Sequence, residues 1–355
     1  MVNEKKAYTL LIIAPFGAHL RNFLSRVEHN TSEIHIITSK PLDFVTKWKH
    51  TIVDFSLKKV SNYWRTVRSI REVTREFNPD VVHIHQLNSV AFFSILAIKR
   101  LNIPIVSTAW GSDVLLLPKQ SFLMKLMVKY CIKSSDAISS DSNHMADEIR
   151  TLMNPSVPDI VVCNFGVSAP LFDLEKENII YSNRLHKPLY RVDLIIRAFS
   201  NFVNTPEGKT WTLVIGATGS ETESLKLLSE NLNLQGKVKF VGWLEREDNM
   251  RWYARSKVWV SIPKSDATAI SLLEAMYNGC YPVVVDLPAS HEWIKSKAQG
   301  RIVKEGEVNF FEGLSKADME MASSINVKLI EKEATYEISE ARFLELHERA
   351  MKRNG

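Results

Sequence analysis

Cysteine is scarce in this sequence. Cys131, Cys163 and Cys280 are the only three among 355 residues, and they lie far apart. Three scattered thiols supply neither the framework of a disulfide-rich secreted domain nor the closely spaced thiolates of a metal site. This usage favours a protein of the reducing cytoplasm.

Long apolar runs are also absent. No stretch approaches the roughly 20 apolar residues that a membrane-spanning helix needs. The chain starts with MVNEKK and passes directly into an apolar segment, without the hydrophobic region and cleavage site of a signal peptide. We therefore expect a cytoplasmic chain with no transmembrane helix.

Glycine-rich motifs and clusters of metal-binding side chains are missing as well. Neither half has Gly-x-Gly-x-x-Gly after an apolar run, which makes a dinucleotide-dependent oxidoreductase the least favoured enzyme class. His83 and His85 lie two positions apart on an expected strand, and we expect them to point to opposite faces and not to bind one metal ion. We predict that no metal or other cofactor is needed.

Charge of one sign is not in large excess, since the net charge is +5. It is unevenly shared: residues 1–166 hold 20 Lys and Arg against 14 Asp and Glu, and the remainder holds 25 against 26. An expected helix over 119–133 carries Lys125, Lys129 and Lys133 at four-residue spacing, with apolar neighbours such as Phe122. The pattern fits a helix that rests on an anionic membrane beside a lipid-linked acceptor, and it also fits a core helix with a solvated lysine face.

What is present is a regular alternation of short apolar runs with helix-period segments, which is typical of α/β folds with parallel sheets. The length allows two domains, because single cores stop growing near about 250–300 residues. Strands are predicted at 8–15, 34–38, 80–85, 103–108 and 137–142, and again at 178–182, 211–215, 238–241, 258–262 and 281–285. Helices are predicted at 62–77, 89–101, 192–203, 221–231, 248–254, 270–278 and 336–352.

Glycine and proline punctuate this pattern near residues 165–171, which predicts a domain boundary there. We expect one Rossmann-like domain over 1–166 and a second over 167–335. The last helix, within 336–355, is expected to pack back towards the first domain. In doubly wound sheets ligands bind at the carboxyl ends of the strands, so we expect the two domains to face one another across a cleft.

The most informative segment is 261–285, SIPKSDATAISLLEAMYNGCYPVVV. A loop with Asp266 follows an expected strand, and a helix starts near Ala269 or Ile270, so that Glu274 lies about one turn inside it. Free N–H groups at a helix start can bind a phosphate with the help of the macrodipole. One carboxylate can then accept hydrogen bonds from sugar hydroxyls and the other from a ribose. Two solvated acids beside a helix are the alternative explanation.

Asp266 and Glu274, with seven residues between them and Gly279 after them, resemble the acidic motif of the retaining glycosyltransferase group 1 family (family 4, GT-B fold), which has two Glu at that spacing. Other segments resemble the family in the same order: 166–172, 182–199, 213–216 and 238–242. The similarity covers residues 165–310 well and the first half more loosely. Five motifs in one order are a far more specific signal than one acidic pair.

The resemblance implies a GT-B fold, with residues 1–166 on the acceptor side and 167–335 binding a nucleotide-sugar donor. It implies two catalytic residues in the second half: Arg184, which would stabilise charge on the donor diphosphate, and Asp266, which would face the transferred sugar. Glu274 would hold the ribose. The other donor contacts implied by the resemblance are Gly216, Gly242, Trp243, Thr268, Ala269 and Ile270.

Two departures from the family lie in the second half. Asp266 replaces a Glu, which shortens the carboxylate by one carbon–carbon bond, about 1.5 Å. Tyr190 and Arg191 stand where the family commonly has Lys-Gly, so Tyr190 would meet the donor with a neutral hydroxyl. Lys187 or Arg191 would then supply the missing cation. We favour Lys187 as the donor contact, with a solvated loop lysine as the alternative.

The first half departs at Trp110, where many relatives have a His that touches the transferred sugar. An indole can stack on a sugar but cannot exchange a proton. Asp113, three residues on, could accept a hydrogen bond from a sugar or acceptor hydroxyl as a further catalytic residue. The alternatives are interdomain packing for Trp110 and helix capping for Asp113. Gly17 either lets the backbone approach the donor phosphates or serves only its turn, and His19 either touches the acceptor or only begins a helix.

These features together predict a metal-independent, retaining, hexosyltransferase-like enzyme. It would move a sugar from a nucleotide diphosphate sugar, with UDP-sugars favoured, to a hydroxyl of a glycan or lipid-linked acceptor. The expected setting is cell-surface polysaccharide or glycolipid synthesis in the cytoplasm, peripheral on the inner membrane face, with no nucleic-acid partner. A GT-B nucleotide-sugar epimerase and a non-catalytic nucleotide-sugar-binding protein are the alternatives.

Overall fold

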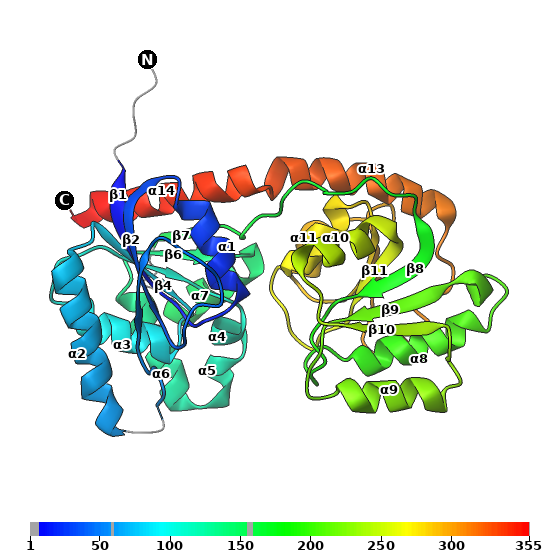
Figure 1. Cartoon of the computed structure of the whole chain (residues 1–355), viewed down its shortest axis with the longest axis horizontal. Coiled ribbons are helices and arrows are strands. Elements are labelled where there is room, and N and C mark those ends of the chain that lie inside the picture. Colours follow the sequence, from blue (N-terminus) through cyan, green and yellow to red (C-terminus); the bar gives the residue numbers. More distant parts are fainter. Residues whose placement is uncertain (1–6, 58–59, 155–158, 355) are drawn as a thin grey trace, which may run out of the picture. The chain divides into compact units, whose positions relative to one another are not determined.

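A computed structural model describes residues 7–57, 60–154 and 159–354 of the chain. The chain forms two compact units (Figure 1). Unit 1 comprises Met1–Phe165 and Tyr336–Gly355, and unit 2 comprises Gly166–Thr335. Each contains a parallel sheet with helices packed on it, so the predicted α/β class with two Rossmann-like domains is confirmed.

The described part of unit 1 contains a seven-stranded parallel sheet in the order β3-β2-β1-β4-β5-β6-β7. The strands are β1 (Tyr8–Ile13), β2 (Thr31–Thr38), β3 (Lys49–Ile52), β4 (Val81–His85), β5 (Ile105–Thr108), β6 (Ala137–Ser140) and β7 (Asp159–Val162). The helices are α1 (Ala18–Val27), α2 (Val60–Phe77), α3 (Ser89–Ile98), α4 (Ser112–Leu115), α5 (Leu117–Gln120), α6 (Phe122–Lys133), α7 (Asn143–Met153) and α14 (Tyr336–Asn354).

The central strand β1 shows why these segments form a sheet. Leu10, Leu11, Ile12 and Ile13 are fully buried, although consecutive strand residues point to opposite faces. An uninterrupted apolar run is typical of a parallel strand that helices cover on both faces. Burying each such side chain contributes about 1.5–3 kcal/mol. The strand order reverses between β1 and β4, and this is the place where doubly wound sheets bind ligands.

The last helix, α14, is joined to this sheet by buried polar side chains. Nδ1 of His347 lies 2.6 Å from the Tyr8 hydroxyl, and its Nε2 lies 2.7 Å from Nδ1 of His83. Nε2 of His83 lies 2.6 Å from Oγ1 of Thr108. Burial lowers the pKa of His83 far below its ordinary value and that of His347 to about 3. Both imidazoles are therefore neutral at physiological pH.

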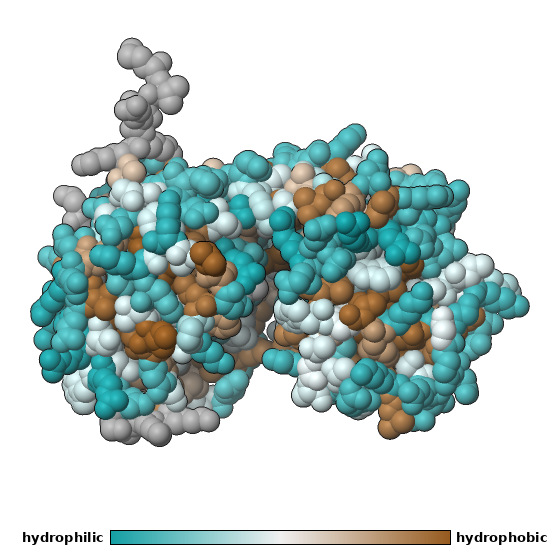
Figure 2. All heavy atoms as spheres, in the orientation of Figure 1, coloured by the Kyte–Doolittle hydropathy of each residue, from teal (hydrophilic) through white to brown (hydrophobic). Residues whose placement is uncertain are grey.

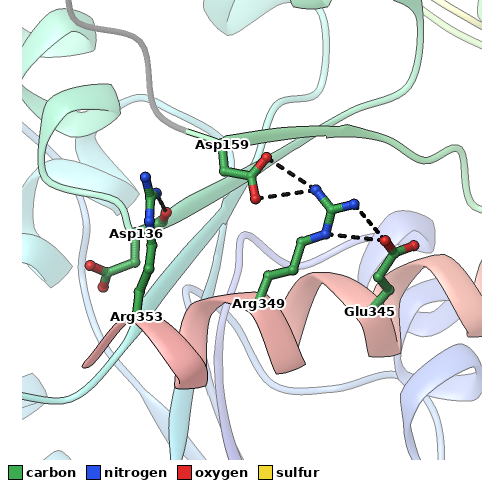
Figure 3. A network of polar contacts seen from close by, with 5 residues as sticks. All are labelled: Asp136, Asp159, Glu345, Arg349 and Arg353. Carbon is green, nitrogen blue, oxygen red and sulfur yellow. Dashed lines mark hydrogen bonds and ion pairs between the residues drawn. The ribbon is translucent and has the colours of Figure 1, made fainter. Parts of the chain in front are cut away.

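Charged side chains near the C-terminal end of α14 attach it to the same unit (Figure 3). The guanidinium of Arg349 donates to both carboxylate oxygens of Asp159 on β7, at 3.1 and 3.2 Å, and to Glu345 one turn earlier on the helix. Arg353 donates to the backbone oxygen of Asp136, at 2.6 Å. The segment after Thr335 is thus held by apolar packing, neutral imidazoles and ion pairs together.

The expected orientation of His83 and His85 is wrong. Their rings are stacked, with centroids 4.6 Å apart and planes 8° from parallel. Residues two positions apart on a strand point to the same face, because the side-chain period is two. A metal ion is nevertheless not their common partner here, since His83 uses both ring nitrogens within the protein.

The described part of unit 2 contains a six-stranded parallel sheet in the order β10-β9-β8-β11-β12-β13, which reverses between β8 and β11. The strands are β8 (Glu177–Ser182), β9 (Thr212–Gly216), β10 (Val238–Gly242), β11 (Ser256–Ser261), β12 (Tyr281–Val285) and β13 (Arg301–Val303). The helices are α8 (Val192–Val203), α9 (Thr222–Asn231), α10 (Arg246–Arg255), α11 (Ile270–Tyr277), α12 (Ser290–Trp293) and α13 (Lys316–Glu333), with one 3-10 turn at Gly208–Thr210.

Several elements that the sequence pattern did not predict have weak apolar signals. The edge strand β3 reads KHTI and leaves its side chains at least partly exposed. In α13 only Ala322, Asn326 and Ile330 are buried, so a single narrow stripe packs against the unit, mainly against α11. Figure 2 shows the complementary feature, apolar residues that interrupt the hydrophilic surface of both units. Exposed apolar residues include Trp64 at 80% and Trp243 at 64%.

Candidate active site

Arg184 and Asp266 meet at the carboxyl ends of the two strands where the order of the unit 2 sheet reverses. Arg184 follows β8 and Asp266 follows β11. Nη2 of Arg184 donates to Oδ2 of Asp266 at 2.6 Å, and Nη1 donates to Oγ of Ser271 at 2.9 Å. The guanidinium also stacks over the ring of Tyr190, 4.4 Å from its centroid. These contacts fix one cation at the ligand-binding edge of the sheet.

This ion pair is largely shielded from water, with side-chain exposures of 11% for Arg184 and 27% for Asp266. Burial raises the pKa of Asp266, and the adjacent guanidinium opposes that shift. Nε of Arg184 is buried with no acceptor in the described part of the chain. A buried donor without a partner is costly, so the guanidinium retains capacity for an anionic ligand.

The start of α11 lies just beyond this pair. Ala269 is the N-cap residue, and no side chain caps the helix. The N–H of Leu272 donates to the Ala269 oxygen, whereas those of Ile270 and Ser271 make no backbone hydrogen bond in the described part of the chain. This end of the helix carries the positive end of the helix dipole. Thr268 is buried, and its hydroxyl accepts a hydrogen bond from the indole of Trp293 at 3.2 Å. The loop is thus anchored while the helix start stays available.

Glu274 lies one turn into α11 and is partly buried beside the fully buried Tyr253. The Tyr253 hydroxyl lies 3.0 Å from Oε2 of Glu274 and donates to it. Burial raises the pKa of Glu274 to about 7, against the opposing effects of the Tyr253 hydrogen bond and of Arg246. Because the pKa of this carboxyl group lies near neutral pH, little free energy is needed to replace its hydrogen bond from Tyr253 with hydrogen bonds from two ligand hydroxyls.

Tyr253 is itself held by an amide network. Nδ2 of Asn183 donates to the Tyr253 hydroxyl at 2.7 Å and to Oδ1 of Asn249 at 3.0 Å. The indole of Trp259 donates to Oδ1 of Asn183 at 3.0 Å. Because Asn183 precedes Arg184 directly, one strand end positions both the cation and the partner of Glu274.

The glycines that end β9 and β10 have different surroundings. A side chain at Gly216 would meet the Tyr181 hydroxyl at 3.1 Å, so this position is closely packed. Gly242 has a φ of 72°, which favours glycine, and open space beside it. The exposed indole of Trp243 follows. Open backbone beside a free aromatic ring is a surface on which a flat ligand can stack.

In unit 1 Trp110 is fixed by two groups. Its indole N–H donates to Nδ1 of His85 at 3.3 Å, and its backbone N–H donates to the Asp113 carboxylate at 3.0 and 3.2 Å. The same carboxylate accepts from the backbone N–H of Leu87 at 2.7 Å. Asp113 is 2% exposed, and burial raises its pKa. As it stands Asp113 orients the loop of Trp110, and a direct contact with substrate remains a prediction.

Gly17 and His19 flank the same region of unit 1. Gly17 has φ 155° and ψ 179°, a region that only glycine occupies readily, and nothing lies within 4 Å of where a side chain would be. The turn therefore needs glycine for its backbone. The ring of His19 lies 4.6 Å from that of Trp110. His19, His85 and Trp110 thus gather at the strand reversal of this sheet.

Both parts of the chain match families of known proteins. Residues 168–317 match the family described as "Glycosyl transferases group 1", and residues 9–142 match "Glycosyl transferase 4-like". The chain belongs to the group 1 glycosyltransferases. It is accordingly an enzyme that transfers sugars, as the sequence predicted.

Individual proteins resemble this group 1 glycosyltransferase at low identity. "Alpha-monoglucosyldiacylglycerol synthase" of Streptococcus pneumoniae is 20% identical over 321 residues, which cover 82% of this chain and 72% of that protein. A glycosyltransferase from Rickettsia africae has a TM-score of 0.80 at 16% identity, over 98% of this chain and 99% of its own. Anabaena Alr3699/HepE, solved with UDP and glucose, has a TM-score of 0.80 at 12% identity, over 95% and 98%. These likenesses establish the GT-B fold.

The position of the second cation expected in a group 1 glycosyltransferase can now be described. Arg191 donates to the backbone oxygens of Ile262 and Pro263 and pairs with Glu305, so its guanidinium is engaged in the structure. Lys187 is exposed and has no ion pair in the described part of the chain. Of the two residues, Lys187 is the one free to reach a ligand. Its contact with the donor remains a prediction.

Sequence reasoning missed Ser271, Tyr253 and Asn183 in this group 1 glycosyltransferase. Ser271 and Asn183 adjoin predicted site residues, and their polarity at a helix start and a strand end was the available signal. Tyr253 lies on α10, far from any recognised motif, and nothing local marks it. The described residues include no group of three His, Cys, Asp or Glu side chains placed to hold a metal ion. None of their helices is long and apolar enough to cross a membrane.

Proposed function

We propose that this glycosyltransferase moves a sugar from a nucleotide diphosphate sugar, a UDP-sugar by preference, to a hydroxyl acceptor, with retention of anomeric configuration and without a metal ion. The observation that carries the proposal is the grouping of Arg184, Asp266 and the uncapped start of α11 at one sheet edge, with Glu274 one turn further in. A cation and free N–H groups match a diphosphate, and two carboxylates match the hydroxyls on either side of it.

In the proposed complex Arg184 and the N–H groups of Ala269 and Ile270 bind the diphosphate. Negative charge grows on the leaving phosphate as its bond to the sugar breaks, and a pre-organised donor at such a point is typically worth about 3–4 kcal/mol of barrier. Glu274 accepts hydrogen bonds from the ribose. Gly242 and Trp243 lie beside the base, and Lys187 supplies the second cation.

The reaction step follows from the same arrangement. The anomeric carbon–oxygen bond to the phosphate breaks, and the acceptor oxygen forms a new bond to that carbon on the same face. The acceptor proton passes to the departing phosphate oxygen. Asp266, held by Arg184, stabilises the positive charge that develops on the sugar ring. Arg184 provides the charge compensation that a divalent metal gives in other transferases.

We infer a role in cell-surface polysaccharide or glycolipid synthesis, peripheral on the inner face of the membrane. One relative is named as a glucosyldiacylglycerol synthase, and one structural neighbour was solved with UDP and glucose. Unit 1 also has exposed apolar side chains on α6, Phe122 at 73% and Leu123 at 70%, next to lysines. This combination supports contact with an anionic lipid surface and a glycan or lipid-linked acceptor.

The test is binding of UDP and a panel of nucleotide sugars by calorimetry in the presence of a chelator. We expect binding by the wild type and a 10- to 100-fold weaker affinity for Glu274→Gln, since a hydrogen bond to a charged group is worth about 1.5–3 kcal/mol. Glu223→Gln, on the exposed face of α9, is the matched control and should bind normally. Failure of every nucleotide and nucleotide sugar to bind would overturn the assignment.

A further inference from the structure

A second cavity, separate from the Arg184 cluster, lies wholly within unit 1. It measures about 290 Å³ and sits at the carboxyl ends of β4 and β5. Gln86 follows β4, and Ser112 follows β5. Side chains of α5 and α6 form the opposite wall, among them Leu117, Met124 and Met127. Sheets of this kind bind ligands at this edge.

The described polar lining consists of uncharged side chains and one carboxyl group, that of Asp113. The side-chain amides of Gln86 and Gln120 make no hydrogen bond in the described part of the chain, and both border the cavity. Asp113, the one acidic group in the lining, already accepts from the backbone N–H groups of Leu87 and Trp110. Among the residues that the structure describes, no Lys or Arg lines the cavity. These residues offer a phosphate no cation, whereas they offer the hydroxyls of a neutral polyol two amides that make no other hydrogen bond.

The backbone of this wall is unusual at one position. Gln86 has a φ of 75°, a conformation that residues other than glycine rarely adopt. Its N–H donates to the Thr108 backbone oxygen, and its own oxygen accepts from Asn88, so the strained turn is held on both sides. Strain of this kind persists where the surrounding structure imposes it, and it concentrates at ligand sites. The turn directs the residue after β4 to the cavity.

The apolar wall continues onto an exposed surface of α6. Met124 and Met127 line the cavity, and Phe122, Leu123 and Leu126 of the same helix are 73%, 70% and 46% exposed. The buried residues of the helix, Val128, Cys131 and Ile132, face the unit. Methionine adapts to flexible apolar ligands, and a run of exposed large apolar side chains marks a docking surface.

The charge of this surface of α6 indicates which kind of membrane it contacts. Residues 114–135 contain four lysines and no acidic residue. Lys125, Lys129 and Lys133 form no ion pair in the part of the chain that the structure describes, and Lys125 and Lys133 are exposed. Unpaired lysines beside exposed Phe and Leu complement an anionic bilayer, where each basic residue near the surface adds about 1 kcal/mol.

We propose that this cavity is an acceptor site for a membrane-borne amphiphile with a neutral, hydroxyl-bearing head. The head, a glycerol or a sugar, lies against Gln86, Gln120 and Ser112. The chain passes along Met124 and Met127 into the bilayer on which Phe122 and Leu123 rest. The inference rests on the proposed function for the transfer itself, but the binding of the amphiphile does not require the donor site to be active.

The first experiment measures binding of the whole chain to phosphatidylglycerol vesicles and to phosphatidylcholine vesicles by sedimentation. We expect binding to the anionic vesicles only, and a loss of at least 10-fold when Phe122 and Leu123 are both changed to Asp. Leu227→Asp, at an exposed position of α9 in unit 2, is the matched control and should bind like the wild type. Equal binding by the double variant would refute the membrane contact.

The second experiment tests the cavity without a donor, with octyl glucoside below its micelle concentration and octyl phosphate as the charged probe. We expect saturable binding of octyl glucoside, no binding of octyl phosphate, and at least 10-fold weaker binding by Met124→Trp, which fills the cavity. Leu126→Trp adds the same bulk on the exposed side of α6 and should leave binding unchanged. Unchanged binding by Met124→Trp, or preference for octyl phosphate, would overturn the proposal.

Transfer to diacylglycerol in the same vesicles separates this proposal from the function. Met124→Trp should abolish transfer while UDP binding stays at the wild-type value. If UDP and nucleotide sugars do not bind to any form of the protein, the proposed function fails. If they bind and octyl glucoside does not, the acceptor inference alone fails.

Discussion

Beside the reversing strands of unit 1 three imidazoles are fully buried, whereas in unit 2 the site is formed by two partly buried carboxylates and a guanidinium, with one buried imidazole, that of His186, nearby. His83, His85 and His347 are completely enclosed, and burial lowers the pKa of the latter two to about 3. In unit 2 Arg184 pairs with Asp266, and burial raises the pKa of Glu274 to about 7. The two sheets have similar topology but opposite electrostatic character at corresponding edges.

The difference separates two tasks. A neutral imidazole can orient an indole, as His85 does for Trp110. Because it carries no charge, it does not repel the positive charge that develops on the transferred sugar. A guanidinium and a carboxylate instead match the separation of charge expected as a sugar–phosphate bond breaks. The imidazoles of unit 1 and Glu274 of unit 2 contribute to the pH dependence of stability with opposite signs. Acid destabilises a folded unit that keeps its imidazoles neutral, whereas it stabilises one that binds a proton on a carboxyl group of raised pKa.

The largest expected effect comes from removing the cation of unit 2. Arg184→Ala should lower kcat by about 10²–10³, the usual loss for one pre-organised donor at a charge-developing atom, with a smaller change in KM. Arg184→Lys should recover only part of the rate, because an ammonium cannot contact Asp266 and Ser271 in the fixed geometry of a guanidinium. Steady-state kinetics with the donor identified by the binding panel measure both.

Arg197→Ala is the matched control, since Arg197 is an exposed arginine of α8 in the same unit. It should retain wild-type kinetics. A full rate in Arg184→Ala would show that the charged cluster of unit 2 is structural, and the contrast with unit 1 would lose its functional meaning.

The two units also show which features the sequence predicts and which it does not. The central strands were predictable because runs such as β1 are apolar throughout, and Arg184, Asp266 and Glu274 were found through spacing along the chain. The contact between Arg184 and Asp266 was not predictable, because it joins residues 82 positions apart across two strand ends. The partnership of Tyr253 with Glu274 likewise exists only once α10 packs beside α11.

Two errors have equally local causes. The sequence pattern predicts the strand that holds His83 and His85, but the expectation that the two side chains lie on opposite faces is wrong, because residues two positions apart on a strand share a face and these two rings stack. The strand β3 was missed because an edge strand with partly exposed polar side chains lacks an apolar signal. The sequence pattern thus predicts which residues of a single helix or strand are buried. The polar site instead depends on which helices and strands pack against one another, and the pattern does not predict this.

A smaller effect tests the pH contrast on stability. Unfolded histidines take up protons below about pH 6.5, while the buried ones in unit 1 do not, so acid favours unfolding of this unit. Its free energy of unfolding should therefore fall as the pH drops from about 6.5 towards 3, the range in which His85 and His347 bind a proton only in the unfolded chain. Unit 2 has the opposite contribution from Glu274, because its carboxyl group binds a proton below about pH 7 in the folded chain but only below about pH 4.5 in the unfolded chain. Burial also lowers the pKa of His186 in unit 2, which offsets part of this contribution.

Urea unfolding at pH 5 and at pH 7, followed by pulsed hydrogen exchange at one fixed pH, measures this. Because peptides from the two units are distinct, the experiment gives the free energy of unfolding of each unit separately. His347→Gln should reduce the pH slope of unit 1 and leave the slope of unit 2 unchanged. His29→Gln, at an exposed position of unit 1, is the control. A steeper acid loss in unit 2 than in unit 1 would contradict the assignment of neutral imidazoles to one and a protonatable carboxyl group to the other.

The smallest effect concerns Tyr253, a positioning residue for the proposed ribose contact. Tyr253→Phe removes the hydroxyl that donates to Glu274, so the pKa of Glu274 should rise further above about 7. If the ionised carboxylate binds the ribose, the pH midpoint of UDP affinity should move up by about one unit, which corresponds to one hydrogen bond to a charged group. Affinity should then be a few-fold weaker at pH 7 and nearly normal at pH 8.5.

Tyr281→Phe is the control, because it loses a comparable hydrogen bond, to the backbone oxygen of Lys297, away from Glu274. It should leave the pH midpoint of UDP affinity unchanged. Because a purely structural defect in Tyr253→Phe would weaken binding equally at both pH values, the shape of the profile decides whether Glu274 acts through its charge.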